Sequence, residues 1–185
     1  MSGEKIIEIV PYILSVLSLA SMVSASLIKG QNMKKILVLV FCGNTLAALS
    51  YLASGGGLNG AASCFIGSAQ TVINYFFESK GKPLPKWLVI IYMLAFVSVN
   101  LAVGMSGDFD PLCILAIVAS LTFVMCIGQK SGAKYRFWTI VNMLLWCTYD
   151  VLTKTWSNLV THVCLLAFTV VGMIIHDRKS GKNKA

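Results

Sequence analysis

Residues 142–150 read Asn-Met-Leu-Leu-Trp-Cys-Thr-Tyr-Asp, within an apolar segment that runs from residue 137 to residue 152. In a helix, four side chains of this stretch share one face, because they follow one another at intervals of four, three and one residues. They are Asn142, Trp146, Tyr149 and Asp150. Facing lipid is costly for an amide, an indole, a phenol or a carboxylate. If this helix crosses a bilayer, its polar face must therefore look onto other helices or onto a hydrated cavity.

The composition of the whole chain is that of a membrane protein. Of its 185 residues 57% are hydrophobic and 12% are charged, and the mean hydropathy is +0.78. This is more apolar surface than a soluble domain of this length can bury. The net charge of +8 does not indicate nucleic acid, because the basic residues lie between apolar segments, where lipid headgroups are their natural partners. The six cysteines lie in apolar segments without Cys-x-x-Cys spacing, so we interpret them as small core residues.

Seven apolar segments have about the length that a helix needs to cross a hydrocarbon core of roughly 30 Å. They are residues 9–28, 36–54, 58–77, 87–105, 111–127, 137–152 and 159–175. The connections at 55–57, 106–110 and 153–158 are short, as between adjacent antiparallel helices. The sequence therefore predicts an all-α integral membrane protein with seven transmembrane helices.

The basic residues mark one side of the membrane. All lysines and arginines except Lys5 and Lys154 fall in the connections after the first, third, fifth and seventh segments. Cytoplasmic loops carry such an excess of basic residues. We therefore predict a multi-pass protein with its amino terminus outside and its carboxyl terminus in the cytoplasm. An even number of segments would place both termini on one side and break the alternation.

The chain carries a faint internal repeat at an offset of 98 residues, which aligns Asn44 with Asn142 and Tyr51 with Tyr149. Each copy contains three segments and one segment lies between them, so both copies enter the membrane in the same direction. We predict a 3+1+3 arrangement of two parallel three-helix repeats. Its parts are the first repeat (9–79), a linker with the fourth helix (80–106), the second repeat (107–177) and a basic cytoplasmic tail (178–185).

Three stretches resemble the bacterial inner-membrane family YgjV. They are Gly30-Gln31-Asn32-Met33-Lys34-Lys35, the residues from Asn44 through Tyr51 to Asn59, and Trp146-Cys147-Thr148-Tyr149-Asp150. The chain is also similar in plan to the SWEET and PnuC transporters, since parallel repeats are a feature of the SWEET fold. The resemblance covers residues 12–179 and implies an inner-membrane location and a transporter-like fold. It also implies association of several copies, such as a trimer, and it implies no particular substrate.

Polar side chains within the segments are candidates for binding a solute. Asn44 and Asn142 offer both donors and acceptors to a neutral polar compound, and aromatic side chains beside them suit a flat ring or a sugar face. Residues 63–74 add a polar stripe along one helix face. The candidate substrate-binding residues are Asn44, Asn142, Trp146, Tyr149, Tyr51, Ser63, Gln70 and Asn74. The alternatives are that the polar residues hold neighbouring helices together and that the tryptophan and tyrosines anchor the protein at the membrane interface.

Asp150 is the one acidic residue, and His162 the one histidine, within the apolar segments. Both lie near the outer ends of consecutive segments, at similar depth, so we predict that they can pair. Such a pair can relay protons or respond to pH. The alternative is that each reaches the water outside. Asn100, in the fourth segment, is a candidate for a contact between copies of the chain.

The leading hypothesis for function is a facilitator that moves a small polar or aromatic metabolite, of the vitamin, nucleoside or sugar class, between the two three-helix bundles. The alternative is a non-transporting membrane scaffold whose polar residues are structural. The sequence shows no nucleotide-binding loop, zinc spacing or serine nucleophile motif, and Asp150 with His162 alone makes a poor catalytic set. We expect no enzyme activity, no cofactor and no metal. The expected partners are membrane lipids, a small solute and further copies of the chain, but not nucleic acid.

Overall fold

The structure is a computed structural model that describes residues 3–28, 32–55, 57–106, 110–129 and 131–182. Within these residues the chain forms seven α-helices and no strand, so the all-α class is confirmed. The helices are α1 (Gly3–Leu27), α2 (Met33–Ala53), α3 (Leu58–Ser79), α4 (Lys86–Gly104), α5 (Leu112–Ile127), α6 (Gly132–Thr153) and α7 (Trp156–Lys182).

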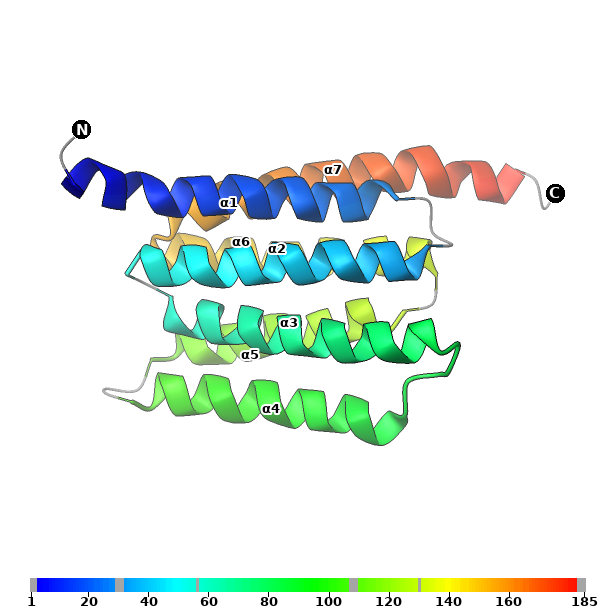
Figure 1. Cartoon of the computed structure of the whole chain (residues 1–185), viewed down its shortest axis with the longest axis horizontal. Helices are drawn as coiled ribbons and strands as arrows, with labels where there is room; N and C mark the ends of the chain where they lie inside the picture. Colours follow the sequence, from blue (N-terminus) through cyan, green and yellow to red (C-terminus); the bar gives the residue numbers. More distant parts are fainter. Residues whose placement is uncertain (1–2, 29–31, 56, 107–109, 130, 183–185) are drawn as a thin grey trace.

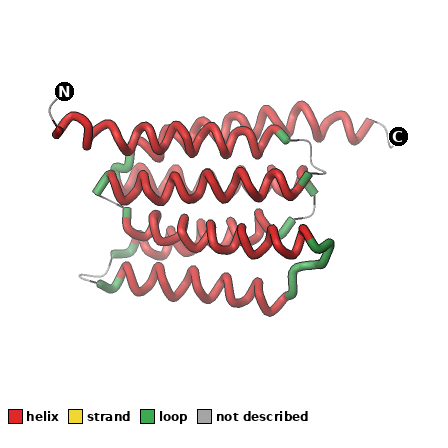
Figure 2. The backbone as a smooth tube through the Cα atoms, in the orientation of Figure 1, coloured by secondary structure: helices red, strands yellow, loops and turns green. Residues whose placement is uncertain are grey.

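The helices form two curtains that lie face to face (Figure 1). α1, α2 and α3 make the front curtain, and α7, α6 and α5 lie behind them in the same order from top to bottom. The curtains pack against each other at their edges, α1 on α7 and α3 on α5, and α4 lies along the edge formed by α3 and α5. Successive helices run in opposite directions, so the loops alternate between the two ends of the bundle (Figure 2).

Four of the described helices are long and apolar enough to cross a membrane by length and composition. They are α1 over Ile9–Leu27, α2 over Met33–Ala53, α4 over Lys86–Gly104 and α7 over Trp156–His176. α5 is apolar but has 16 residues, and α3 and α6 carry polar side chains that lower their hydropathy. The described chain therefore contains several membrane-spanning helices. That all seven cross the membrane stays a prediction.

The surface of the described helices is largely apolar, unlike that of a soluble protein. Large apolar side chains point outward on the described helices, including Phe76, Trp87 and Leu94, each more than half exposed. Amides and one carboxylate lie in the interior instead, and Asn100 and Asp150 are completely buried. Lipid covers an apolar surface of this kind at no cost, whereas buried polar groups must find partners inside the bundle. Many of the polar residues that weaken the hydropathy of α3 and α6, such as Gln70, Asn142 and Asp150, are therefore ones that these helices turn inward.

Several helices extend beyond the predicted apolar segments. α6 begins at Gly132 rather than at residue 137, and α1 begins at Gly3 rather than at residue 9, which places Pro11 inside the helix. Hydropathy marks only the part of a helix that fits the hydrocarbon core, and helices continue into the headgroup layer. Some residues used to predict the loops and the repeat lie outside the described part of the chain. They are Lys29, Gly30, Gln31, Gly56, residues 107–109, Lys130 and Lys184.

Candidate functional site

A cavity lies inside the bundle, and all seven described helices contribute to its wall. Four of the predicted binding residues line it, namely Asn44, Ser63, Asn142 and Trp146, and His162 lines it as well. The space open to the centres of water molecules is about 50 Å³, and the total unoccupied space with its mouth is about 680 Å³. One water needs roughly 10–15 Å³ by the first measure. The cavity therefore has room for a few water molecules.

α2 and α6 bring Asn44 and Asn142 to the same cavity, but the two amides are bonded differently. Nδ2 of Asn142 donates to the carbonyl oxygen of Ala119 at 2.6 Å and to Oγ1 of Thr122 at 2.9 Å. Nδ2 of Asn44 is buried and has no hydrogen-bond partner among the described residues. Asn142 therefore ties α6 to α5, whereas the amide nitrogen of Asn44 is the one available to a solute.

Ser63 belongs to a hydrogen-bonded chain that joins α3, α4 and α5. The hydroxyl of Ser120 donates to Oγ of Ser63 at 2.9 Å, and Ser63 donates to Oδ1 of Asn100 at 3.0 Å. Asn100 in turn donates from Nδ2 to the carbonyl oxygen of Phe96 at 2.8 Å. Asn100 is completely buried, so the prediction that its amide contacts another copy of the chain is wrong. Its side chain holds α4 against the bundle instead.

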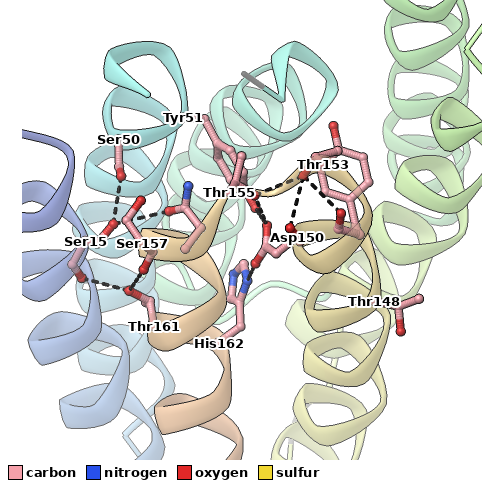
Figure 3. Close-up of polar contacts among 12 residues, drawn as sticks. Ser15, Ser50, Tyr51, Thr148, Asp150, Thr153, Thr155, Ser157, Thr161 and His162 are labelled. Carbon is pink, nitrogen blue, oxygen red and sulfur yellow. Dashed lines mark hydrogen bonds and ion pairs between the residues drawn. The ribbon is translucent and has the colours of Figure 1, made fainter. Parts of the chain in front are cut away.

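Asp150 lies behind the cavity wall, in contact with the wall residue His162, and is completely buried. Tyr51 donates its hydroxyl to Oδ1 at 2.7 Å and Thr155 donates to the same oxygen at 2.9 Å, while Nδ1 of His162 lies 2.6 Å from Oδ2 (Figure 3). One carboxylate thus joins α2, α6 and α7 and the turn between α6 and α7. The structure brings Asp150 and His162 into contact, with 12% of the His162 side chain exposed. A role of the pair in moving protons stays a prediction.

Aromatic rings surround this carboxylate. The Trp146 ring stacks on the His162 ring with centroids 6.1 Å apart and an angle of 27° between their planes. The Tyr149 ring packs edge-on against Trp146 at 5.3 Å, and the Tyr51 ring lies 6.4 Å away on the other curtain. Tyr149 and Tyr51 are buried, so neither is an exposed interfacial anchor. Trp146 faces the cavity, and the two tyrosines support it from behind.

A glycine in α3 makes room for the Tyr51 ring. A Cβ atom at Gly60 would lie 2.8 Å from Cζ of Tyr51, closer than real side-chain carbons approach. α3 can therefore pass directly over the phenol, which holds the hydroxyl in line with Asp150. This packing explains why the loop after α2 is followed by a glycine in the first turn of α3.

Gln70 and Asn74 lie outside the central cavity, although the polar stripe of α3 predicted them on one path with Ser63. Both side chains are buried, and Asn74 lines a second pocket at the far end of the bundle. That pocket is bordered by Lys82, Pro83 and Leu84 of the loop after α3. α3 therefore carries polar groups past the central cavity toward the end where the basic loops lie.

Sequence reasoning missed three residues that complete these networks. Thr155 binds Asp150 through its hydroxyl, and its backbone N–H donates to the Asp150 carbonyl oxygen at 3.0 Å. Thr122 on α5 accepts a hydrogen bond from Asn142, and Ser120 on the same helix donates one to Ser63. Isolated serines and threonines in apolar helices usually bond to their own backbone, so no local signal separates these three from the others.

The chemistry of the cavity wall is neutral. Its described residues include no Asp, Glu, Lys or Arg, and His162 is the one imidazole. Within the described part of the chain no three His, Cys, Asp or Glu side chains gather closely enough to hold a metal ion, and the cysteines are free thiols. The wall offers hydroxyls, amides and aromatic faces, which bind neutral compounds through hydrogen bonds and stacking.

An apolar surface, several helices that can cross a bilayer and a polar interior define an integral membrane protein of the all-helical class. The chain belongs to the YgjV family of bacterial inner membrane proteins, whose family model matches residues 9–180. This match confirms the predicted family and the bacterial inner membrane as the location. Comparisons with curated proteins and with solved structures gave no match.

Proposed function

We propose that the protein is a facilitator through which a small, neutral polar or aromatic metabolite crosses the inner membrane. The observation that carries this proposal is that Asn44 on α2 and Asn142 on α6 line one internal cavity together with Trp146. The three residues come from both curtains, so a solute between the curtains would contact both. A vitamin, nucleoside or sugar has the hydrogen-bonding groups and flat faces that such a wall can bind.

The central cavity is closed to such a solute in this structure. It has room for a few water molecules, whereas pockets for ligands of this size usually measure about 300–1,000 Å³. The curtains must therefore separate for a solute to enter. Their edge contacts, α1 on α7 and α3 on α5, are the places where such a movement would act. We propose that the solute moves down its concentration gradient.

The 3+1+3 plan is part of the proposal, and the arrangement of the helices supports it. A half-turn about the long axis of the bundle would carry α1, α2 and α3 onto α5, α6 and α7 without reversing their direction (Figure 1). α4 lies outside both sets. Parallel repeats related by an axis along the membrane normal have this geometry. The domain limits 9–79, 80–106 and 107–177 and a relation to the SWEET and PnuC transporters follow from the same proposal.

The proposed orientation places the amino terminus outside and the carboxyl terminus in the cytoplasm. Lys34 and Lys35 start α2, Lys80 and Lys82 follow α3, and Lys134 starts α6. These positions share one end of the bundle, at the right of Figure 1. The positive-inside rule assigns that end to the cytoplasm. The cluster around Asp150 then lies near the outer surface.

We also propose that Asp150 and His162 respond to protons during transport. His162 is the member of the pair that lines the cavity, and its ring stacks on Trp146. A proton gained or lost by the pair would change the charge beside the solute path and the hydrogen bond that joins α6 to α7. The other partners in this proposal are membrane lipids and further copies of the chain, which the family resemblance implies associate as a trimer. The proposal includes no catalytic reaction.

The alternative function is a membrane scaffold that transports nothing. The observation that favours it is the pair of hydrogen bonds from Asn142 to α5, because they show an intramembrane amide that holds helices together. In a scaffold the Asn44 amide would also serve to hold helices together. No added solute would then raise the stability of the protein.

The experiment that tests the proposal is thermal unfolding of the purified protein in detergent with nicotinamide, uridine, glucose and related compounds. A compound that binds the native state raises the unfolding free energy by about 2.7 kcal/mol at 100 times its Kd. We expect a rise in Tm for wild type that is smaller in Asn44→Ala. Asn59→Ala is the matched control, because Asn59 is also a buried amide with an unpartnered atom but lies outside the cavity wall. A panel without any shift, or a shift that is as large in Asn44→Ala as in wild type, would favour the scaffold.

A further inference from the structure

The second pocket, or end pocket, lies at the end of the bundle that carries the basic loops. It is bordered by the start of α2, the end of α3 and the end of α5, and the space open to water centres is about 60 Å³. Glu78 and Lys82 both line it, so the fixed charges of its wall have opposite signs. Asn74 is the buried amide in this wall. Its Oδ1 accepts a hydrogen bond from Tyr92 at 3.2 Å, whereas its Nδ2 has no partner among the described residues.

Unpartnered amide atoms gather between this pocket and the central cavity. Six buried side-chain atoms lack a hydrogen-bond partner in the described chain, and four of them belong to Asn44, Gln70 and Asn74. Gln70 lacks a partner for both Nε2 and Oε1 and is 1% exposed. It lies one helical turn from Asn74 on the same face of α3. These amides therefore form a row from the central cavity to the end pocket.

Asn44 lies at the end of this row that borders the central cavity, next to Gly67 of α3. A Cβ atom at Gly67 would lie 3.1 Å from Nδ2 of Asn44 and 2.9 Å from the Phe123 ring. The bare backbone of α3 thus lets the amide of α2 reach the helix face that continues to Gln70. A buried amide that finds no protein partner loses its hydration energy, and native proteins recover that energy with ordered water or a bound ligand.

An apolar cluster separates the central cavity from the end pocket. Val40 lines the central cavity, Leu37 and Ile127 line the end pocket, and all three belong to one buried cluster. Val40 and Leu37 are one turn apart on α2. This cluster is therefore the barrier between the central cavity and the end pocket. The row of amides runs beside it along α3.

We propose that the end pocket is a second solute site, the inner vestibule of the route, where Asn74 binds the same neutral compound before or after it passes the barrier of Leu37, Val40 and Ile127. Gln70, one turn further along α3, is the next amide on this route. Like the central cavity, the end pocket has room for only a few water molecules in this structure, so it must widen to bind the compound. The compound would carry carbonyl or hydroxyl groups that accept from and donate to these amides. This inference rests on the proposed transport function. It adds a binding site on the cytoplasmic side and names the residues that must move apart for passage.

The test is thiol labelling of Asn74→Cys in inverted membrane vesicles with a charged maleimide that does not cross membranes. Ile73→Cys is the matched control, because Ile73 is the next residue on α3 and faces outward, where lipid excludes a charged reagent. Wild type gives the background from the native cysteines. We expect position 74 to react at least about tenfold faster than position 73, since thiols react as thiolates in water. We also expect nicotinamide, uridine or glucose to slow labelling at position 74.

Equal labelling at positions 73 and 74 would overturn the proposal, and so would fast labelling at position 74 that no probe slows. The separate thermal-shift measurement shows whether the central site itself has failed. The part of the rise in Tm that Asn44→Ala removes reports the central cavity, and any part that remains in Asn44→Ala and is removed by Asn74→Ala reports the end pocket. Gln70→Leu gives a check that needs no cysteine variant. A dry amide replaced by leucine would raise Tm, whereas a hydrated amide in a binding site predicts no rise.

Discussion

Tyr51→Phe tests the hydrogen-bonded cluster around Asp150 with the smallest chemical change. The phenyl ring keeps its place above Gly60 and beside Trp146, so the loss is the hydroxyl that donates to Asp150 at 2.7 Å. A hydrogen bond to a charged group contributes about 1.5–3 kcal/mol. Thr155 still donates to the same oxygen, which places the expected cost near the lower end, at about 2 kcal/mol. Since about 1.4 kcal/mol is a factor of ten, the ratio of folded to unfolded protein falls by roughly 30-fold.

The assay is reversible unfolding in mixed micelles by added SDS, followed by tryptophan fluorescence. Tyr12→Phe is the control, because the Tyr12 side chain is 57% exposed on α1 and its variant loses no buried bond. We expect the free energy of unfolding to fall for Tyr51→Phe and to stay within about 0.5 kcal/mol of wild type for Tyr12→Phe. Equal effects of the two variants would refute the view that Tyr51 holds α2 to α6 through Asp150.

Three further predictions follow from the same packing. Gly60→Ala places a methyl group 2.8 Å from Cζ of Tyr51 and should cost about 1–3 kcal/mol in SDS unfolding, more than Gly43→Ala, whose methyl meets a flexible methionine side chain. Ser63→Ala removes the donor to the buried amide oxygen on α4 and should lower the unfolding free energy by about 1–3 kcal/mol in the same assay, an expectation that an unchanged value contradicts. His162→Phe keeps an aromatic ring beside the cavity and removes the hydrogen-bond partner of Oδ2 of Asp150, so it should lower the unfolding free energy by about 1–3 kcal/mol in the same assay, and an unchanged value would contradict this expectation.

The sequence predicts the inward polar face of α6 well, for physical reasons. Periodicity assigns Asn142, Trp146, Tyr149 and Asp150 to one side of a helix, and the cost of polar groups in lipid turns that side inward. Matched depth on consecutive antiparallel helices was enough to bring Asp150 near His162. These inferences depend only on position along a helix and on the direction of the chain.

The lateral order of helices is what the sequence does not contain. Asn142 donates to α5. Asn100 accepts from Ser63 on α3, which in turn accepts from Ser120 on α5, and α5 packs on both α4 and α6. The periodicity of an apolar helix does not show which other helices it packs against. The same gap explains why Gln70 and Asn74 were predicted on the central path, although α3 carries them past it to the end pocket.

The central claim is that the cavity between the curtains conducts a neutral solute, and uptake into proteoliposomes tests it most directly. The compound that raises Tm is supplied outside vesicles that contain wild type, Asn44→Leu or Asn59→Leu. The account predicts uptake by wild type and Asn59→Leu that stops when the inner and outer concentrations are equal, and no uptake by Asn44→Leu, whose apolar side chain removes the free amide from the wall. Uptake by all three variants, or by none, would contradict it.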